Sequence, residues 1–219
     1  MSEKDSNNIS FESPEKFDSD VSYICKNPYS EYLKFQTFFQ KHINEFGRDS
    51  FHPTMSVFSC HQNIVGVVTC RETESKNDLY VALAEMLYFP MSISSELFII
   101  ATDVTVTSPD DVKKDAMVVT FVTPDHCLIF TTPYIYNSDN TINWLMQESF
   151  INKVTHSITT GDSPLGDMVE LFFVFSHSSN PGPFTYEEVL RYFNVTGFSY
   201  QILNEQNIDD KNSIAIRFG

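Results

Sequence analysis

The chain is poor in glycine, in basic side chains and in long apolar runs, and each shortage argues against a class of function. Only seven of its 219 residues are glycine, and they combine into neither a dinucleotide fingerprint nor a P-loop, so a glycine-rich phosphate cradle is excluded. Its longest purely apolar runs, such as 97–101 and 172–175, are far shorter than the ~20 residues that a membrane-spanning helix needs. We therefore expect no membrane partner.

Basic residues are outnumbered by acidic ones. Fourteen lysines and arginines stand against 29 aspartates and glutamates, which gives a formal net charge of −15. Nucleic-acid binding depends on basic side chains that displace counterions from phosphates, so we expect no direct contact with DNA or RNA. The acidity has two interpretations: a surface that docks on a basic protein, or a solvated surface that keeps the chain soluble.

Cysteine is also scarce. The four cysteines lie too far apart for a disulfide framework. The amino terminus has neither the basic start nor the apolar stretch of a secretion signal. We therefore expect a cytoplasmic protein with reduced thiols. A hairpin would place two of the cysteines, Cys60 and Cys70, opposite each other.

A metal site would have to draw on Cys60-His61, Cys70 and His126-Cys127. Structural zinc sites use ligands two to four residues apart, whereas neighbours in a strand point to opposite faces. No H-x-H or H-E-x-x-H motif occurs. We expect no structural metal and no cofactor.

The same cysteines and histidines would also serve as a nucleophile and base, oriented by Asp103 or Asp125. A catalytic cysteine normally lies at a helix N-terminus or beside a cation, where the thiolate is favoured. The predicted strand positions of Cys60 and Cys70 offer neither. A small Cys-His hydrolase is therefore the weaker alternative for this chain.

Composition and hydrophobic pattern divide the chain into three parts. Residues 1–20 are polar and predict a disordered acidic tail. Residues 21–160 predict an α+β core domain, because the hydrophobic segments follow in the order helix, hairpin, helix, three strands, helix. Residues 161–219 predict a strand, a short helix and two strands that pack on this core.

Local signals place the core elements. A first helix over 29–46 has Gly47 as its C-terminal cap. Its apolar face is predicted from Tyr32, Phe35, Phe39, Ile43 and Phe46. The later core elements are predicted as a hairpin of 53–60 and 64–70, a helix capped by Asn77 or Asp78 that Pro90 ends, strands over 96–106, 116–122 and 127–136, and a third helix over 141–158.

The carboxyl-terminal part contains a sequence motif that marks the start of a helix. Thr185 and Glu188 form a capping box that opens a short helix to about residue 193. Strands are predicted before and after it, over 168–176, 197–203 and 214–218.

The predicted fold is α+β, with a central antiparallel sheet of about five strands, flanking helices and a C-terminal β-α-β-β extension. This order of elements is similar to that of the roadblock, longin and GAF or PAS modules. The resemblance is one of element order alone, and no motif residue extends it to a function.

Aromatic side chains are abundant, and most of the phenylalanines are expected in the core. Tyr134, Tyr136 and Trp144 are the interface candidates, because they flank a predicted strand-to-helix corner and because tyrosine and tryptophan tolerate half-burial.

Together these observations favour a non-enzymatic interaction or scaffolding module, cytosolic or virus-encoded, that acts through an acidic, aromatic-bearing surface. A basic protein and a second copy of the chain are the partners left open. The alternative is a GAF- or PAS-like sensory domain that binds a small ligand. An enclosed apolar pocket would favour the sensor, an exposed aromatic patch the interaction module, and a cysteine beside a histidine in a cleft the hydrolase.

Overall fold

A computed structural model of the chain describes residues 8–9, 18, 24–25, 27–59, 63–107, 111–155 and 184–204. Contacts divide the chain into two compact units. The first unit comprises Met1–Phe51, Ala101–Thr120 and His126–Thr155, and the second comprises His52–Ile100, Phe121–Asp125 and His156–Gly219. The domain boundaries expected at residues 20 and 160 stay predictions.

Helices and antiparallel strands share the described residues, which confirms the α+β class. The helices are α2 (Pro28–Phe46), α3 (Lys76–Met86), α4 (Tyr88–Ser92) and α6 (Tyr186–Thr196), with short 3-10 turns η1 (Arg48–Ser50) and η2 (Met146–Glu148). The strands are β1 (Asn8–Ile9), β2 (Thr54–Phe58), β3 (Ile64–Thr69), β4 (Leu97–Thr107), β5 (Lys113–Val122), β6 (His126–Tyr136), β7 (Ile142–Trp144), β8 (Phe150–Thr155) and β9 (Ser199–Ile202).

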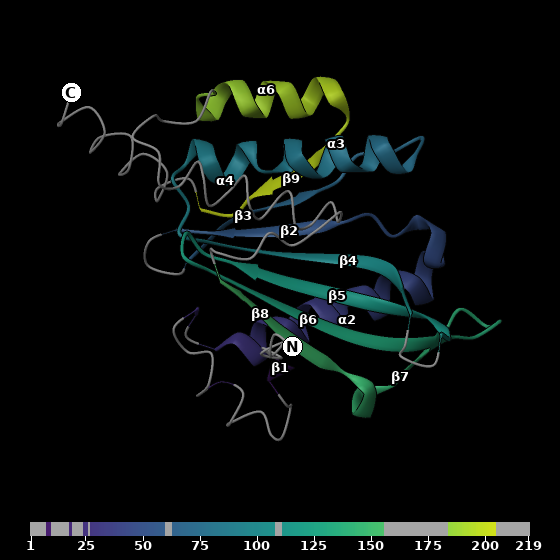
Figure 1. Cartoon of the computed structure of the whole chain (residues 1–219). Coiled ribbons are helices and arrows are strands. Elements are labelled where there is room, and N and C mark those ends of the chain that lie inside the picture. The colour runs from purple at the N-terminus through teal and green to yellow at the C-terminus, as the bar shows by residue number, and fades with distance from the viewer. Residues whose placement is uncertain are drawn as a thin grey trace. The chain divides into compact units, whose positions relative to one another are not determined.

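The sheet is larger than the five strands predicted. Its hydrogen-bonded order in the described residues is β1-β8-β6-β5-β4-β2-β3-β9, and β7 pairs with β6 (Figure 1). One edge strand, β1, pairs with β8 and comes from the segment that the sequence predicts to be a disordered tail.

Helix α2 forms where the sequence predicts it. Pro28 occupies its first turn, where a missing N–H costs nothing, and the carboxylate of Asp18 accepts the N–H of Tyr29 at 2.8 Å. Gly47 ends the helix with a φ of 83° and donates its N–H to the Ile43 carbonyl.

The apolar face of α2 is confirmed for four of its five predicted residues, Tyr32, Phe35, Phe39 and Ile43, which are buried. It is wrong for Phe46, whose side chain is 62% exposed. Phe46 is the last helical residue, and the chain turns at Gly47 into η1. The apolar spacing of α2 therefore continues to Phe46, one turn past Ile43, the last residue of this face that is buried.

In the first unit, α2 packs against β6 (Figure 1). The ring of Tyr32 lies 4.0 Å from that of Phe130, centroid to centroid. The hydroxyl groups of Tyr32 and Thr132 share a hydrogen bond of 2.7 Å. Burial of these rings supplies the apolar contact that stabilises a helix on a sheet.

The third helix predicted over 141–158 is wrong. This stretch forms β7, η2 and β8 instead. In β8, Phe150 is 38% exposed and Ile151 is fully buried, which is the alternation of a strand. The stretch is rich in β-branched and Asn residues, which favour helix weakly. Pairing of Ile151 with Phe130 of β6 decides the outcome.

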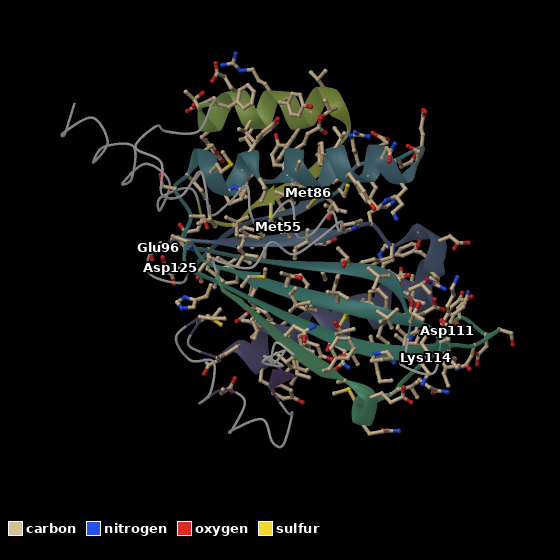
Figure 2. All side chains as sticks on the ribbon, viewed as in Figure 1. Met55, Met86, Glu96, Asp111, Lys114 and Asp125 are labelled. Carbon is tan, nitrogen blue, oxygen red and sulfur yellow. The ribbon has the colours of Figure 1, made fainter. Side chains whose placement is uncertain are left out.

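In the second unit, β2 and β3 form the predicted hairpin, and β9 pairs with β3. The cap predicted for α3 at Asn77 or Asp78 is wrong. Ser75 caps the helix two residues before Asn77, by accepting the N–H of Asp78. It ends at Met86, and Pro90 lies inside the following short helix α4. Met55 of β2 and Met86 of α3 are fully buried between these elements (Figure 2).

The capping box of α6 is confirmed. Thr185 accepts the N–H of Glu188, whose carboxylate accepts the N–H of Thr185. Gly197 ends the helix in the left-handed conformation, and β9 follows as predicted. The strands predicted over 168–176 and 214–218 lie outside the described residues.

None of the helices formed by the described residues is both long enough and apolar enough to span a bilayer.

Candidate interaction surface

Two of the three interface candidates lie together, but beneath α2. Tyr134 and Trp144 are paired across β6 and β7, with ring centroids 5.7 Å apart. The ring of Phe39 from α2 lies 5.5 Å from Tyr134 and 5.8 Å from Trp144. Tyr134 is only 2% exposed, so its ring supplies core packing rather than contact area. The strand-to-helix corner expected here is instead a β-hairpin of β6 and β7, and α2 packs over it.

The two candidates other than Tyr134 keep part of their surface. Trp144 is half-buried and donates its indole N–H to the side-chain oxygen of Gln40 at 3.1 Å. Tyr136 is half-buried and donates its hydroxyl to Asn140 at 2.6 Å. Both polar tips are already satisfied within the first unit. An interface role for these two side chains stays a prediction.

A different set of aromatic side chains lies on the outside of α2. Phe38, His42 and Phe46 follow one another at intervals of four residues, and Phe51 packs beside them; we name these four the α2 aromatic row. Phe38 is 43% exposed and Phe46 is 62% exposed. The ring of His42 lies 6.0 Å from Phe38 and 5.1 Å from Phe46. The row is thus a continuous aromatic strip on the surface of the first unit.

The middle of the row is held in place by Phe51 and by the hydrogen bonds of His42. Phe51 packs edge-on against Phe39 at 4.6 Å and against His42 at 5.7 Å. His42 Nε2 lies 3.1 Å from the carbonyl oxygen of Ser50. A carbonyl can only accept, so this network assigns the proton to Nε2. The Ser50 hydroxyl donates in turn to the Gly47 carbonyl at 2.7 Å.

A charged cluster anchors the turn that carries Phe51. Arg48 of η1 donates Nε to Asp103 at 2.8 Å and Nη1 to Asp115 at 2.6 Å. Tyr134 donates its hydroxyl to the second oxygen of Asp103 at 2.7 Å. Burial raises the pKa of Asp103 by more than these bonds lower it. One guanidinium thereby ties η1 to β4 and β5.

The charges on the α2 surface are mixed rather than acidic. Lys34 pairs with Glu31 at 2.7 Å. Lys41 and Glu45 are exposed next to the row and have no ion-pair partner in the described part of the chain. A shallow depression of about 440 Å³ adjoins them and is lined by Thr37, Gln40, Lys41, Asn44 and Glu45. The exposed charges of α2 therefore do not form an acidic patch.

A second depression, in the second unit, is polar as well. It measures about 630 Å³ and is lined by His52, Thr69, Cys70, Arg71, Glu72, Glu85, Thr196, Gly197 and Ser199. The guanidinium of Arg71 binds Asp78 at 2.6 Å and Glu85 at 3.4 Å, and it holds the pKa of Asp78 at about 2. Its donors are engaged within the protein. Neither depression is the enclosed apolar cavity that a sensory domain would use.

The cysteines in the described residues are buried thiols. Burial raises the pKa of Cys25, Cys70 and Cys127 to about 12 in each case, so the nucleophilic thiolate is disfavoured at neutral pH. Cys70 shares its depression with His52, yet this pKa gives no support to a Cys-His hydrolase. Cys60 and His61 lie outside the described residues.

Within the described ranges, no three His, Cys, Asp or Glu side chains gather closely enough to hold a metal ion. Of the zinc candidates, Cys70 belongs to the second unit and His126-Cys127 to the first. The absence of a structural metal stays a prediction.

Sequence reasoning missed the α2 aromatic row. It assigned Phe46 to the core and passed over Phe38, although the spacing of Phe38, His42 and Phe46 marks one stripe of a helix.

Comparison of the chain with protein-family models, with curated proteins and with solved structures gives no match.

Proposed function

We propose that the chain is a non-enzymatic cytoplasmic interaction module that binds a protein partner through the α2 aromatic row. The observation that carries this proposal is the combination of exposure and order in that row. Phe38 and Phe46 expose 43% and 62% of their surface, while ring contacts and hydrogen bonds hold the row in place.

Exposure of aromatic side chains to water is thermodynamically unfavourable, because water solvates their surface poorly. An exposed aromatic row is therefore typical of a binding surface. The same side chains dominate the binding free energy of protein interfaces. A row ordered before binding loses little conformational entropy when a partner arrives. The anchoring of η1 by Arg48 therefore supports a surface prepared for contact.

Photo-crosslinking tests this proposal. Phe46→p-benzoylphenylalanine keeps an aromatic ring at the row, and Val195→p-benzoylphenylalanine is the control, because Val195 is 86% exposed on α6 in the second unit. We expect irradiation in cells that express the chain to give a discrete crosslinked species from position 46 and none from position 195. Equal or diffuse labelling from two correctly folded variants would contradict the proposal.

A further inference from the structure

Lys41 and Glu45 form a charged edge along the α2 aromatic row. Successive residues of an α-helix turn by about 100°, so Phe38, His42 and Phe46 form one stripe, and Lys41 and Glu45 both fall on the same side of it. Both side chains are exposed. Within the described residues neither has an ion-pair partner, although they stand one turn apart in the same helix.

This edge is complementary to itself when α2 is reversed. A two-fold axis at the level of Ile43, midway between Lys41 and Glu45, would bring the charged edges of the two helices together. Phe38 of one copy would then lie beside Phe46 of the other, about 3 Å away along the helix axis. With a rise of 1.5 Å per residue, Lys41 of one copy would lie level with Glu45 of the other, whereas the two Lys41 residues would be about 6 Å apart along the helix axis. Two such pairs would form, because the symmetry repeats the contact.

From this complementarity we propose that the partner of the α2 aromatic row is a second copy of the same chain, docked with α2 antiparallel to α2. The proposal rests on the proposed function, since it names the partner of the same surface. A parallel arrangement would not bring Lys41 to Glu45, so the charges specify direction as well as partner.

Local charge favours a second copy over a basic protein. The surface of α2 carries the exposed Lys34, Lys41 and Glu45 together with the half-buried Glu31, which leaves this helix surface close to neutral on a chain of net charge −15. A basic partner would find little attraction here. Two copies can meet at this surface without strong local repulsion between like charges.

The contact should be weak. Helix α2 has 19 residues, so it is about 28 Å long, and one helix pair buries less than the roughly 800 Å² per partner of a standard interface. The dimer should therefore dissociate on dilution.

Sedimentation equilibrium of purified Lys41→Glu and Glu45→Lys variants tests the arrangement. Each single reversal would place like charges opposite each other twice, so we expect the dimer dissociation constant to rise about tenfold for either variant. An equimolar mixture of the two should recover wild-type association, because the charges are again complementary between unlike copies. Overall charge alone predicts something different: Lys41→Glu would weaken the dimer, and Glu45→Lys would strengthen it.

Lys113→Glu is the matched control, because Lys113 is an exposed residue of β5 and the substitution changes the net charge as Lys41→Glu does. It should leave association within about twofold of wild type. A wild-type chain that stays monomeric at every concentration, or a mixture no tighter than its components, would overturn the proposal. If position 46 then still crosslinks to a different protein, the proposed function stands and only the self-association fails. If position 46 crosslinks to nothing, both fail.

Discussion

Removal of the Arg48 guanidinium tests whether the charged cluster fixes the end of α2. Arg48→Met keeps an unbranched side chain of comparable length and deletes both bonds, the 2.8 Å bond to Asp103 and the 2.6 Å bond to Asp115. It leaves Asp103, whose side chain is only 14% exposed, with the single donor that Tyr134 provides. The substitution thus creates a buried carboxylate without its counter-charge.

The expected loss follows from these contacts. A hydrogen bond to a charged group contributes about 1.5–3 kcal/mol to stability, and a fully buried pair that loses one partner costs about 3–5 kcal/mol. Arg48 and Asp115 keep about a quarter of their side-chain surface in water, so solvent screening reduces both values. We expect Arg48→Met to lower the free energy of unfolding by about 2–3 kcal/mol.

Urea unfolding followed by tryptophan fluorescence measures this loss. Trp144 is the only tryptophan, and it contacts Phe39 and Tyr134 in the first unit. Arg191→Met, at an exposed position of α6 in the second unit, is the control and should cost less than about 0.5 kcal/mol. In the Arg48→Met background, Asp103→Asn removes the unpaired charge and should restore about 1 kcal/mol.

The loss should depend on pH. Burial raises the pKa of Asp103 in the folded protein above its unfolded value, so ionisation of Asp103 costs stability as the pH rises through the folded pKa. Deletion of Arg48 raises this pKa further. The loss from Arg48→Met should therefore be largest near about pH 8 and smaller near about pH 5, where Asp103 takes up its proton more readily. A loss below about 0.5 kcal/mol, or one independent of pH, would refute the role assigned to this cluster.

Two further predictions concern packing and thiol reactivity. Phe39→Ala should lower the free energy of unfolding by about 3–5 kcal/mol, because its ring is fully buried. Phe38→Ala should lower it by less than about 1 kcal/mol, because that ring is 43% exposed. Similar losses for the two variants in urea unfolding would contradict the assignment of Phe38 to the surface. In a Cys60→Ser background, Cys25, Cys70 and Cys127 should stay unreactive toward a disulfide reagent at neutral pH until the chain is unfolded. The reason is that burial raises the pKa of each thiol to about 12. Rapid modification of Cys70 in the folded protein would instead support the hydrolase alternative.

Signals carried by a few neighbouring residues were predictable. The capping box of Thr185 and Glu188, the stop of α2 at Gly47 and the hairpin of β2 and β3 follow from contacts within one turn or one pair of strands. The stretch 141–158 was not predictable in the same way, since its apolar spacing suits a helix and its β-branched residues suit a strand. Pairing with β6 resolved that ambiguity.

The burial of the candidate surface residues was likewise not predictable from neighbouring residues alone. Tyr134 and Trp144 were expected to flank a strand-to-helix corner, but this stretch is the β-hairpin of β6 and β7, and α2, about 100 residues earlier in the chain, covers Tyr134. Phe46 fits the apolar face of α2 by spacing, yet the surface that this face covers ends before it.

The sequence by itself determined the acidic charge, the end of α2 at Gly47, the start of α6 at its capping box and the α+β class, because these depend on composition and on residues close in the chain. Only the tertiary structure decided which aromatic rings are buried and which face water. Burial depends on what lies opposite a side chain, and for α2 that surface is provided by β6, as in the bond between Tyr32 and Thr132 across 100 residues.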